Sequence, residues 1–83
     1  MDSKINEVVQ MLENLNNDNA IPKNIRKALT DACARLKGPE EITVKVSAAV
    51  YLIESISDDI NMPAHARTQI WGVISALESL KVR

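Results

Sequence analysis

The sequence predicts an all-α protein in which four helices form two tandem helical hairpins. Apolar residues recur at helical spacing along most of the chain. Helix-breaking residues divide it into four segments, at Pro22, at Gly38–Pro39 and at Pro63. An offset of 41 residues also aligns the first half of the chain with the second. A chain of 83 residues fits a single domain, 1–83, with hairpins at about 1–38 and 39–83.

The first hairpin is predicted from two amphipathic stripes. The first helix is expected from about Ser3 to Asn16, with the apolar stripe Ile5, Val8, Val9, Leu12 and Leu15. The second is expected from Pro22, whose fixed φ suits a first helical position, to about Lys37. Its stripe consists of Ile25, Ala28, Leu29, Ala32, Cys33 and Leu36. Cys33 is therefore predicted to be buried and unreactive.

The second hairpin is predicted with a more apolar first helix, from about Glu40 to Ser57. This helix is apolar over more than half of its circumference, which predicts a central position in the fold. Thr43–Val46 alternates like a strand, but the surrounding period favours a helix. The last helix is expected from Pro63 to about Lys81. Gly72 in its interior costs about 1 kcal/mol relative to alanine, which predicts the close approach of a neighbouring helix.

The internal repeat joins these segments into one architecture. Of 42 residue pairs at the 41-residue offset, seven are identical, and the apolar positions also keep register. The identical pairs include Asp18/Asp59, Pro22/Pro63 and Arg26/Arg67, which surround the two hairpin joints. Two repeats are fewer than the three or more that an open helical array needs. We therefore expect the hairpins to close on each other as a compact four-helix bundle.

Two resemblances follow from these residues. The hairpin pattern, with an Asp in the turn and an Arg one turn into the next helix, resembles HEAT and armadillo repeats. Asn61–Trp71, Val8–Glu13 and the Ile21–Arg26 joint are similar to a family of small archaeal proteins catalogued as uncharacterised. The second resemblance would cover nearly the whole chain. It implies an all-helical domain in an archaeal cytoplasm and carries no activity, cofactor or catalytic residue.

Composition argues against several classes of function. The net charge is −1, and one Cys with one His leaves no internal disulfide and no structural zinc site. No apolar run reaches the roughly 18–20 residues that cross a bilayer, so a cytoplasmic protein without a membrane segment is expected. No glycine-rich loop could hold phosphate, and the carboxylates lie in turns and on polar faces. We therefore predict no enzyme activity, no catalytic residue, no cofactor and no metal.

The duplicated joints provide the first candidate residues. Asp18 with Arg26 and Asp59 with Arg67 could form a charged patch that binds a partner. They could also stabilise the fold, with each Arg bound to a turn carbonyl or to the matching Asp. The structural role is favoured, because duplicated positions usually serve the duplicated fold.

Three residues of the second hairpin are candidates for an interface. Tyr51 and Trp71 are expected between core and solvent, where aromatic side chains occur in protein interfaces. His65 is expected in the first turn of the last helix, either exposed or capping it. The leading hypothesis is a protein–protein interaction or structural module without catalysis, which binds a protein partner or self-associates.

The alternative hypothesis is a nucleic-acid-associated protein. Residues 22–37 carry five basic side chains and one acidic one. Lys23, Lys27 and Arg35 are the predicted phosphate contacts on this basic face. Asp31 interrupts the face and no exposed aromatic residue lies within it, so a solvated face beside acidic neighbours is the competing interpretation.

Overall fold

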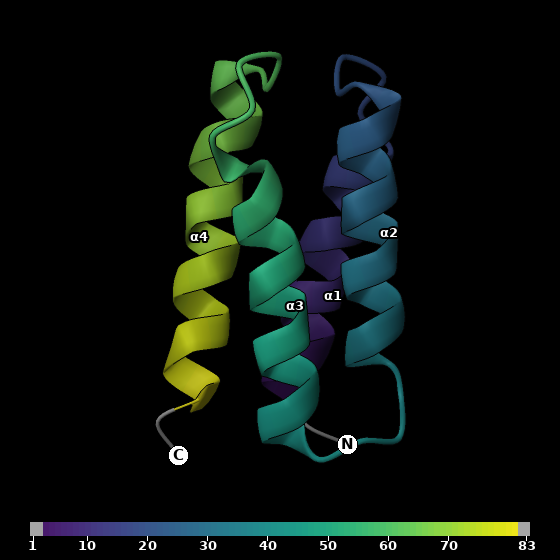
Figure 1. The fold of residues 1–83 in the computed structure, drawn as a ribbon, viewed down its shortest axis with the longest axis vertical. Helices are drawn as coiled ribbons and strands as arrows, with labels where there is room; N and C mark the ends of the chain where they lie inside the picture. Colours follow the sequence, from purple (N-terminus) through teal and green to yellow (C-terminus); the bar gives the residue numbers. More distant parts are fainter. Residues whose placement is uncertain (1–2, 82–83) are drawn as a thin grey trace.

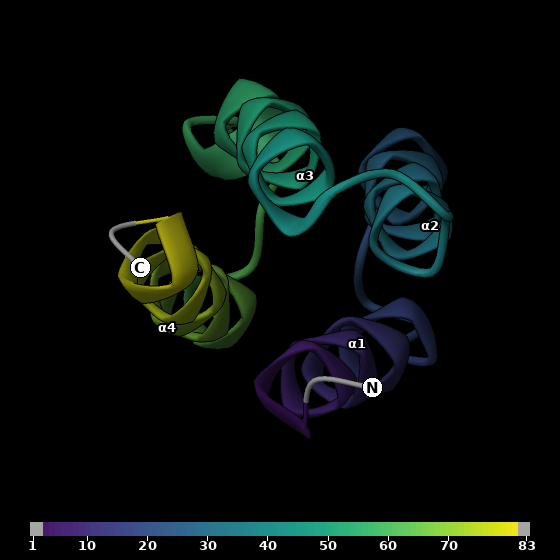
Figure 2. The same ribbon diagram turned by 90° about the horizontal axis from the view of Figure 1, so that it is seen from below.

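Residues 3–81 are described by the computed structural model, and this part of the chain consists of four α-helices without a strand. They are α1 (Ser3–Asn16), α2 (Lys23–Leu36), α3 (Ile42–Ser57) and α4 (Ala64–Lys81). The helices alternate in direction and stand in a ring, as the end view shows (Figures 1 and 2). The predicted all-α bundle is confirmed, with extents of 33 × 19 × 18 Å.

The ring is closed by contact between the first and last helices. α1 packs against α2 and α4, and α3 packs against α2 and α4. Both hairpin joints lie at one end of the bundle, and the α2–α3 connection lies at the other (Figure 1). An open array would leave the first and last helices apart. Because α1 and α4 are in contact, the bundle has the closed form that was expected for two repeats. The likeness to HEAT and armadillo repeats stays a prediction about the joints.

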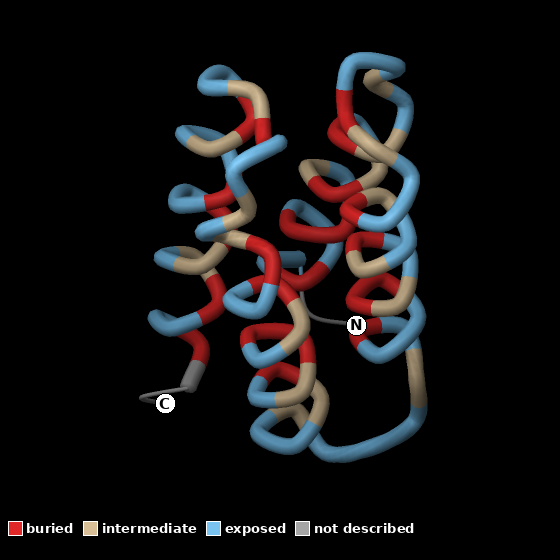
Figure 3. Tube along the Cα trace, turned by 45° about the horizontal axis from the view of Figure 1, so that its top comes forward, coloured by how far each residue is buried: buried red, intermediate tan, exposed pale blue. Residues whose placement is uncertain are grey.

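Each helix turns one apolar side towards a common core (Figure 3). The predicted stripes of the first hairpin are buried except for Ala28, which is partly buried, and Leu12, Leu29, Ile53 and Ile70 are among the fully buried large side chains. Cys33 is buried as predicted. No polar or charged residue is buried within the described part of the chain. Burial of apolar surface therefore supplies the main stabilisation of this small domain.

α3 is not central, which corrects the prediction made from its wide apolar circumference. In a ring of four helices each helix keeps one side in solvent, and α3 leaves Val44 and Tyr51 exposed there. Its buried side is formed by Val46, Ala49, Val50, Ile53 and Ile56. The additional apolar residues therefore lie on an outer surface. This surface needs an explanation other than core packing.

Two further local predictions were wrong. Pro22 is the residue before α2 rather than its first helical residue, with ψ at 154°. Gly72 is exposed, and a Cβ atom there would meet only the Met11 Cε atom at 3.9 Å, an ordinary contact. No close helix approach explains this glycine. Thr43–Val46 is helical, as the surrounding period indicated.

Candidate functional site

The turns of the two hairpin joints share the same two hydrogen bonds to the Asp residue. The Oδ1 atom of Asp18 accepts from the Ala20 amide at 2.9 Å, and Oδ1 of Asp59 accepts from the Asn61 amide at 2.8 Å. The carbonyl of each Asp also accepts the amide three residues on, that of Ile21 or Met62. Each Asp thus holds its own turn in the way that this residue type favours. The repeat is preserved in three dimensions as well as in sequence.

The second carboxylate oxygen of each Asp reaches the other hairpin. Oδ2 of Asp18 lies 2.6 Å from Nε2 of His65, and Oδ2 of Asp59 accepts from the Asn24 side chain at 3.4 Å. Asn24 and His65 are matched positions at the 41-residue offset. The two contacts are therefore related by the repeat, and they join the hairpins reciprocally at the end that carries both joints. Sequence reasoning missed Asn24 and missed His65 as the partner of Asp18.

One of the two matched arginines binds a main-chain carbonyl with its side chain. Nη2 of Arg67 donates to the Asp59 carbonyl at 3.0 Å, so this side chain holds a turn carbonyl. Arg26 shows no corresponding bond, and its own carbonyl accepts from the Thr30 hydroxyl at 3.0 Å. Neither Arg forms an ion pair with the Asp of its joint within residues 3–81. The predicted Asp–Arg pairs are thus neighbours in the joint, while the carboxylates bind His65 and Asn24.

The pKa of the Asp18 carboxyl group is lowered in the folded protein. The hydrogen bond from His65, followed by that from the Ala20 amide, lowers the pKa of Asp18 below its ordinary value of 3.8. A carboxyl group whose pKa is lowered by folding stabilises the fold above its unfolded pKa. That contribution is lost as the pH falls through the lowered value.

We expect Asp18→Asn to flatten the loss of stability on acidification below about pH 4. Asn can still accept the Ala20 amide, but it removes the charge that couples folding to pH. Thermal melting between pH 7 and pH 2 measures the effect, and the wild type should lose more melting temperature than the variant. His65→Asn should also flatten the profile, because it installs the residue found at Asn24. An unchanged acid slope in Asp18→Asn would contradict the assignment.

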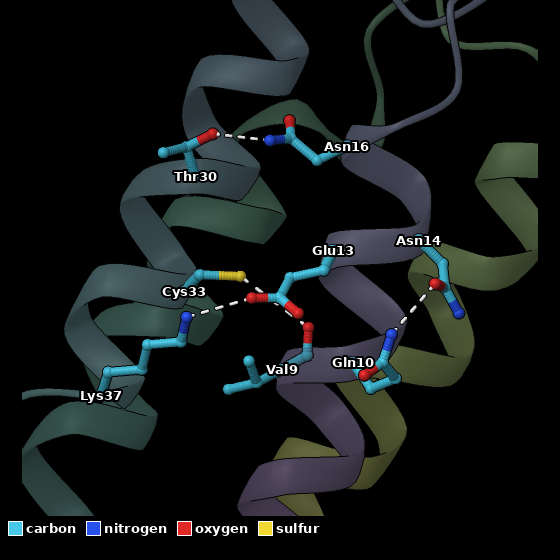
Figure 4. A network of polar contacts seen from close by, with 8 residues as sticks. All are labelled: Val9, Gln10, Glu13, Asn14, Asn16, Thr30, Cys33 and Lys37. Atoms are coloured by element: carbon cyan, nitrogen blue, oxygen red, sulfur yellow. Dashed lines mark hydrogen bonds and ion pairs between the residues drawn. The ribbon is translucent and has the colours of Figure 1, made fainter.

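The outer seam of the first hairpin is closed by polar contacts (Figure 4). Nζ of Lys37 lies 3.0 Å from Oε2 of Glu13, and this carboxylate raises the pKa of Lys37. The Asn16 amide donates to the Thr30 hydroxyl at 3.0 Å. On the outside of α1, Gln10 donates to Asn14 at 3.1 Å. The exposed side chains named here on the α1–α2 side are therefore polar and paired with one another.

The second hairpin replaces these polar residues with aromatic and acidic ones. At the 41-residue offset, Thr30 corresponds to Trp71 and Gln10 corresponds to Tyr51. The Glu13–Lys37 ion pair corresponds to Glu54 and Glu78, two acids. All four residues of the second hairpin are exposed. We call Tyr51, Glu54, Trp71 and Glu78 the aromatic–acidic face.

The aromatic side chains of this face are more exposed than predicted. Tyr51 is 75% exposed and Trp71 is 58% exposed, rather than placed between core and solvent. Tyr51 and Glu54 are neighbours on α3, because residues three apart share one side of a helix. Trp71 and Glu78 lie two turns apart on one side of α4. The repeat matches Tyr51 and Trp71 to positions on the outside of α1 and α2, so two predicted interface residues lie on the outer sides of α3 and α4, while His65 lies in the joint with Asp18.

The predicted phosphate contacts do not form one cluster. Lys23, Lys27 and Arg35 are all exposed on α2. Lys27 is paired with Asp31 at 3.2 Å. Lys23 and Arg35 stand twelve residues apart, about 18 Å along a helix axis. The basic charge of α2 is therefore dispersed and partly neutralised.

Other features of the surface are modest. A groove of about 130 Å³ between α1 and α4 is lined by Met11, Asn14 and Gln69, which sequence reasoning did not single out. Within residues 3–81, no three His, Cys, Asp or Glu side chains come together as metal ligands would. No helix in this part of the chain has the length and apolar character needed to span a membrane.

The fold and surface define a small four-helix bundle made of two matched hairpins, one of which has an aromatic outer seam. The chain belongs to the uncharacterised protein family UPF0147, whose model matches residues 1–80. A UPF0147 protein of Sulfurisphaera tokodaii is 41% identical over 81 residues, which cover 96% of this chain and 91% of that protein. One from Pyrococcus furiosus is 42% identical over 83 residues, covering 98% and 89%.

Solved structures show the same fold. A crystal structure of a UPF0147 protein from Thermoplasma acidophilum has a TM-score of 0.88 at 34% identity, covering 94% of this chain and 93% of the other. A crystal structure of a protein of unknown function has a TM-score of 0.87 at 40% identity, covering 92% and 88%. The expected resemblance to an uncharacterised archaeal family is confirmed.

Proposed function

We propose that this protein is a non-catalytic protein-interaction module of the archaeal cytoplasm. In this proposal, a partner protein docks on the aromatic–acidic face of the second hairpin. The observation that carries it is the exposure of Trp71 and Tyr51 at positions where the first hairpin has small or polar residues. The matched hairpin folds without aromatic residues there, so folding alone does not require them.

The residue types suit a docking surface. Tyr and Trp provide large amphipathic contact areas and are enriched among the residues that dominate binding energy. Val44 extends the exposed apolar surface along α3. The nucleic-acid alternative has less support, because Lys27 is already ion-paired and the basic side chains of α2 are spread out.

The experiment replaces each aromatic residue by its counterpart in the first hairpin. We expect the double variant Tyr51→Gln/Trp71→Thr to fold, because the matched positions already accept Gln10 and Thr30. Loss of a central aromatic contact costs about 2 kcal/mol or more, so capture of a specific partner should fall on the order of 30-fold. The measurement is affinity capture from the native cytoplasm by the full chain, with mass spectrometry.

The control is Gln10→Ala/Thr30→Ala, which changes the same positions of the first hairpin. This control should capture the same proteins as the wild type. The proposal fails if the aromatic variant, shown to be folded by circular dichroism, retains every specific partner. It also fails if the wild type captures nothing beyond what an empty matrix retains.

A further inference from the structure

A groove and an exposed aromatic ring lie level with each other on opposite flanks of α4. This helix packs between α1 and α3 in the ring (Figure 2). On the α1 flank, Gln69 lines the groove of about 130 Å³ together with Met11 and Asn14. Trp71 follows two residues later, so it lies about 200° around the helix from Gln69 and about 3 Å further along its axis. The same helix therefore presents a hollow on one flank and an indole ring on the other.

Gly72 leaves space beside this groove. Its position is exposed, and a Cβ atom there would lie 3.9 Å from Cε of Met11, which lines the groove. A side chain longer than that of alanine would therefore narrow the opening. Glycine in a helix interior is unfavourable relative to alanine, and no close contact within residues 3–81 requires it here. Access to the groove accounts for a residue that the fold itself does not need.

The groove suits an aromatic ring. Apolar cavities of about 150 Å³ can hold a benzene ring, so a groove of about 130 Å³ that opens to solvent has room for a similar group. The thioether of Met11 makes favourable contacts with aromatic rings. The side-chain amides of Asn14 and Gln69 offer carbonyl oxygens to an indole N–H group, which can only donate. Size and chemistry thus match the side chain that α4 presents on its other flank.

The surface around the groove and the ring is uncharged. Residues 68–77 of α4 contain no acidic or basic side chain. Gln10, Met11 and Asn14, on the adjoining side of α1, are neutral as well. A twofold interface brings the same patch of both copies together, so like charges there would repel. Depletion of charge is also typical of the centre of protein interfaces. This surface can therefore meet a second copy of itself without repulsion.

We propose that this surface forms a homodimer in which Trp71 of each copy enters the groove of the other. A twofold axis parallel to α4 exchanges the two flanks of the helix and preserves height along it. Because Trp71 and the groove are level and on opposite flanks, this single operation places both rings over both grooves. The contact is isologous and closes at two copies. The inference rests on the proposed function and names a second copy as the occupant of the Trp71 side of its face.

A twofold axis perpendicular to α4 would give a different dimer. It reverses the helix direction and keeps each flank on its own side, so Trp71 would meet Trp71 and both grooves would stay open. A substitution at Gly72 distinguishes the two arrangements, because only the first requires an open groove.

Sedimentation equilibrium of the full-length protein provides the test. We expect a dimer at concentrations on the order of 10–100 µM. Trp71→Thr, which installs the counterpart Thr30, should weaken dimerisation on the order of a hundredfold, because each dimer loses two ring contacts. Gly72→Gln should also dissociate the dimer, while its diluted monomer melts at a higher temperature than the diluted wild type, because glutamine favours helix more than glycine does. That combination separates a blocked groove from a failure to fold.

Tyr51→Gln is the control, because Tyr51 is an exposed aromatic residue on α3 and away from the groove. It should leave the dimer unchanged. A mixture of Trp71→Thr and Gly72→Gln should recover part of the association, since one variant keeps the groove and the other keeps the ring. The inference is overturned if the wild type is a monomer at about 1 mM, or if Gly72→Gln dimerises like the wild type. It is also overturned if Tyr51→Gln dissociates the dimer as strongly as Trp71→Thr.

The homodimer and the proposed function fail on different results. If the wild type is a monomer while captured partners depend on Tyr51 and Trp71, the docking face stands and self-association is wrong. If the dimer forms while Tyr51→Gln/Trp71→Thr retains every captured partner other than the protein itself, the dimer stands and the proposed docking of another protein fails.

Discussion

Ile25→Ala is expected to lower the free energy of unfolding by about 2–5 kcal/mol. Ile25 is fully buried near the start of α2. Truncation removes its transfer free energy and leaves a cavity that the surrounding helices fill only in part. Domains of this kind have total stabilities of about 5–15 kcal/mol, so the variant should lose a large share of its stability. Urea unfolding followed by circular dichroism measures the change.

Ile60→Ala is the matched control, because it makes the same chemical change in solvent. Ile60 is 91% exposed in the joint between α3 and α4. Its truncation should change the free energy of unfolding by less than about 0.5 kcal/mol. Similar losses in both variants would mean that Ile25 does not pack in the core as described.

Ala66→Ile is expected to destabilise the protein by about 1–3 kcal/mol, although it makes the two hairpins more alike. Ala66 is the counterpart of Ile25 in the second hairpin, and both side chains are fully buried. A packed interior has no room for three additional carbon atoms, so side chains must leave their preferred rotamers. The repeat therefore aligns buried positions whose side chains differ in volume.

Ala34→Ile separates overpacking from helix propensity. Ala34 is exposed on α2, where isoleucine loses only the propensity difference, about 0.5 kcal/mol. The free energies of unfolding of the two variants in urea should therefore differ by about 0.5–2.5 kcal/mol, given the overpacking cost. An Ala66→Ile variant as stable as Ala34→Ile would show unfilled space beside Ala66.

The helices and their buried sides could be predicted from the sequence because both depend on local periodicity. Leu12 and Leu29 are buried as their stripes indicate, and each helix begins and ends within two residues of its expected position. Pro22 was misplaced by one residue, since the same fixed φ suits the residue before a helix and its first residue. The repeat then predicted the compact bundle, because two hairpins must cover each other.

The contacts between hairpins could not be predicted in the same way. Asp18 and His65 are 47 residues apart, and their pairing depends on how two joints meet at one end of a ring. The exposure of Val44 and Tyr51 likewise depends on which helices flank α3. The acidic character of the aromatic–acidic face could be predicted from the sequence, because the repeat aligns Lys37 with Glu78.

The reciprocal contacts of Asp18 with His65 and of Asp59 with Asn24 make the bundle equivalent to a dimer of hairpins fused into one chain. In a true homodimer every substitution appears twice, so a new binding surface on one subunit also appears on the other. A single chain has no such constraint. One hairpin keeps a seam closed by polar contacts while the other carries Trp71 and Tyr51, and the molecule offers a partner one face instead of two.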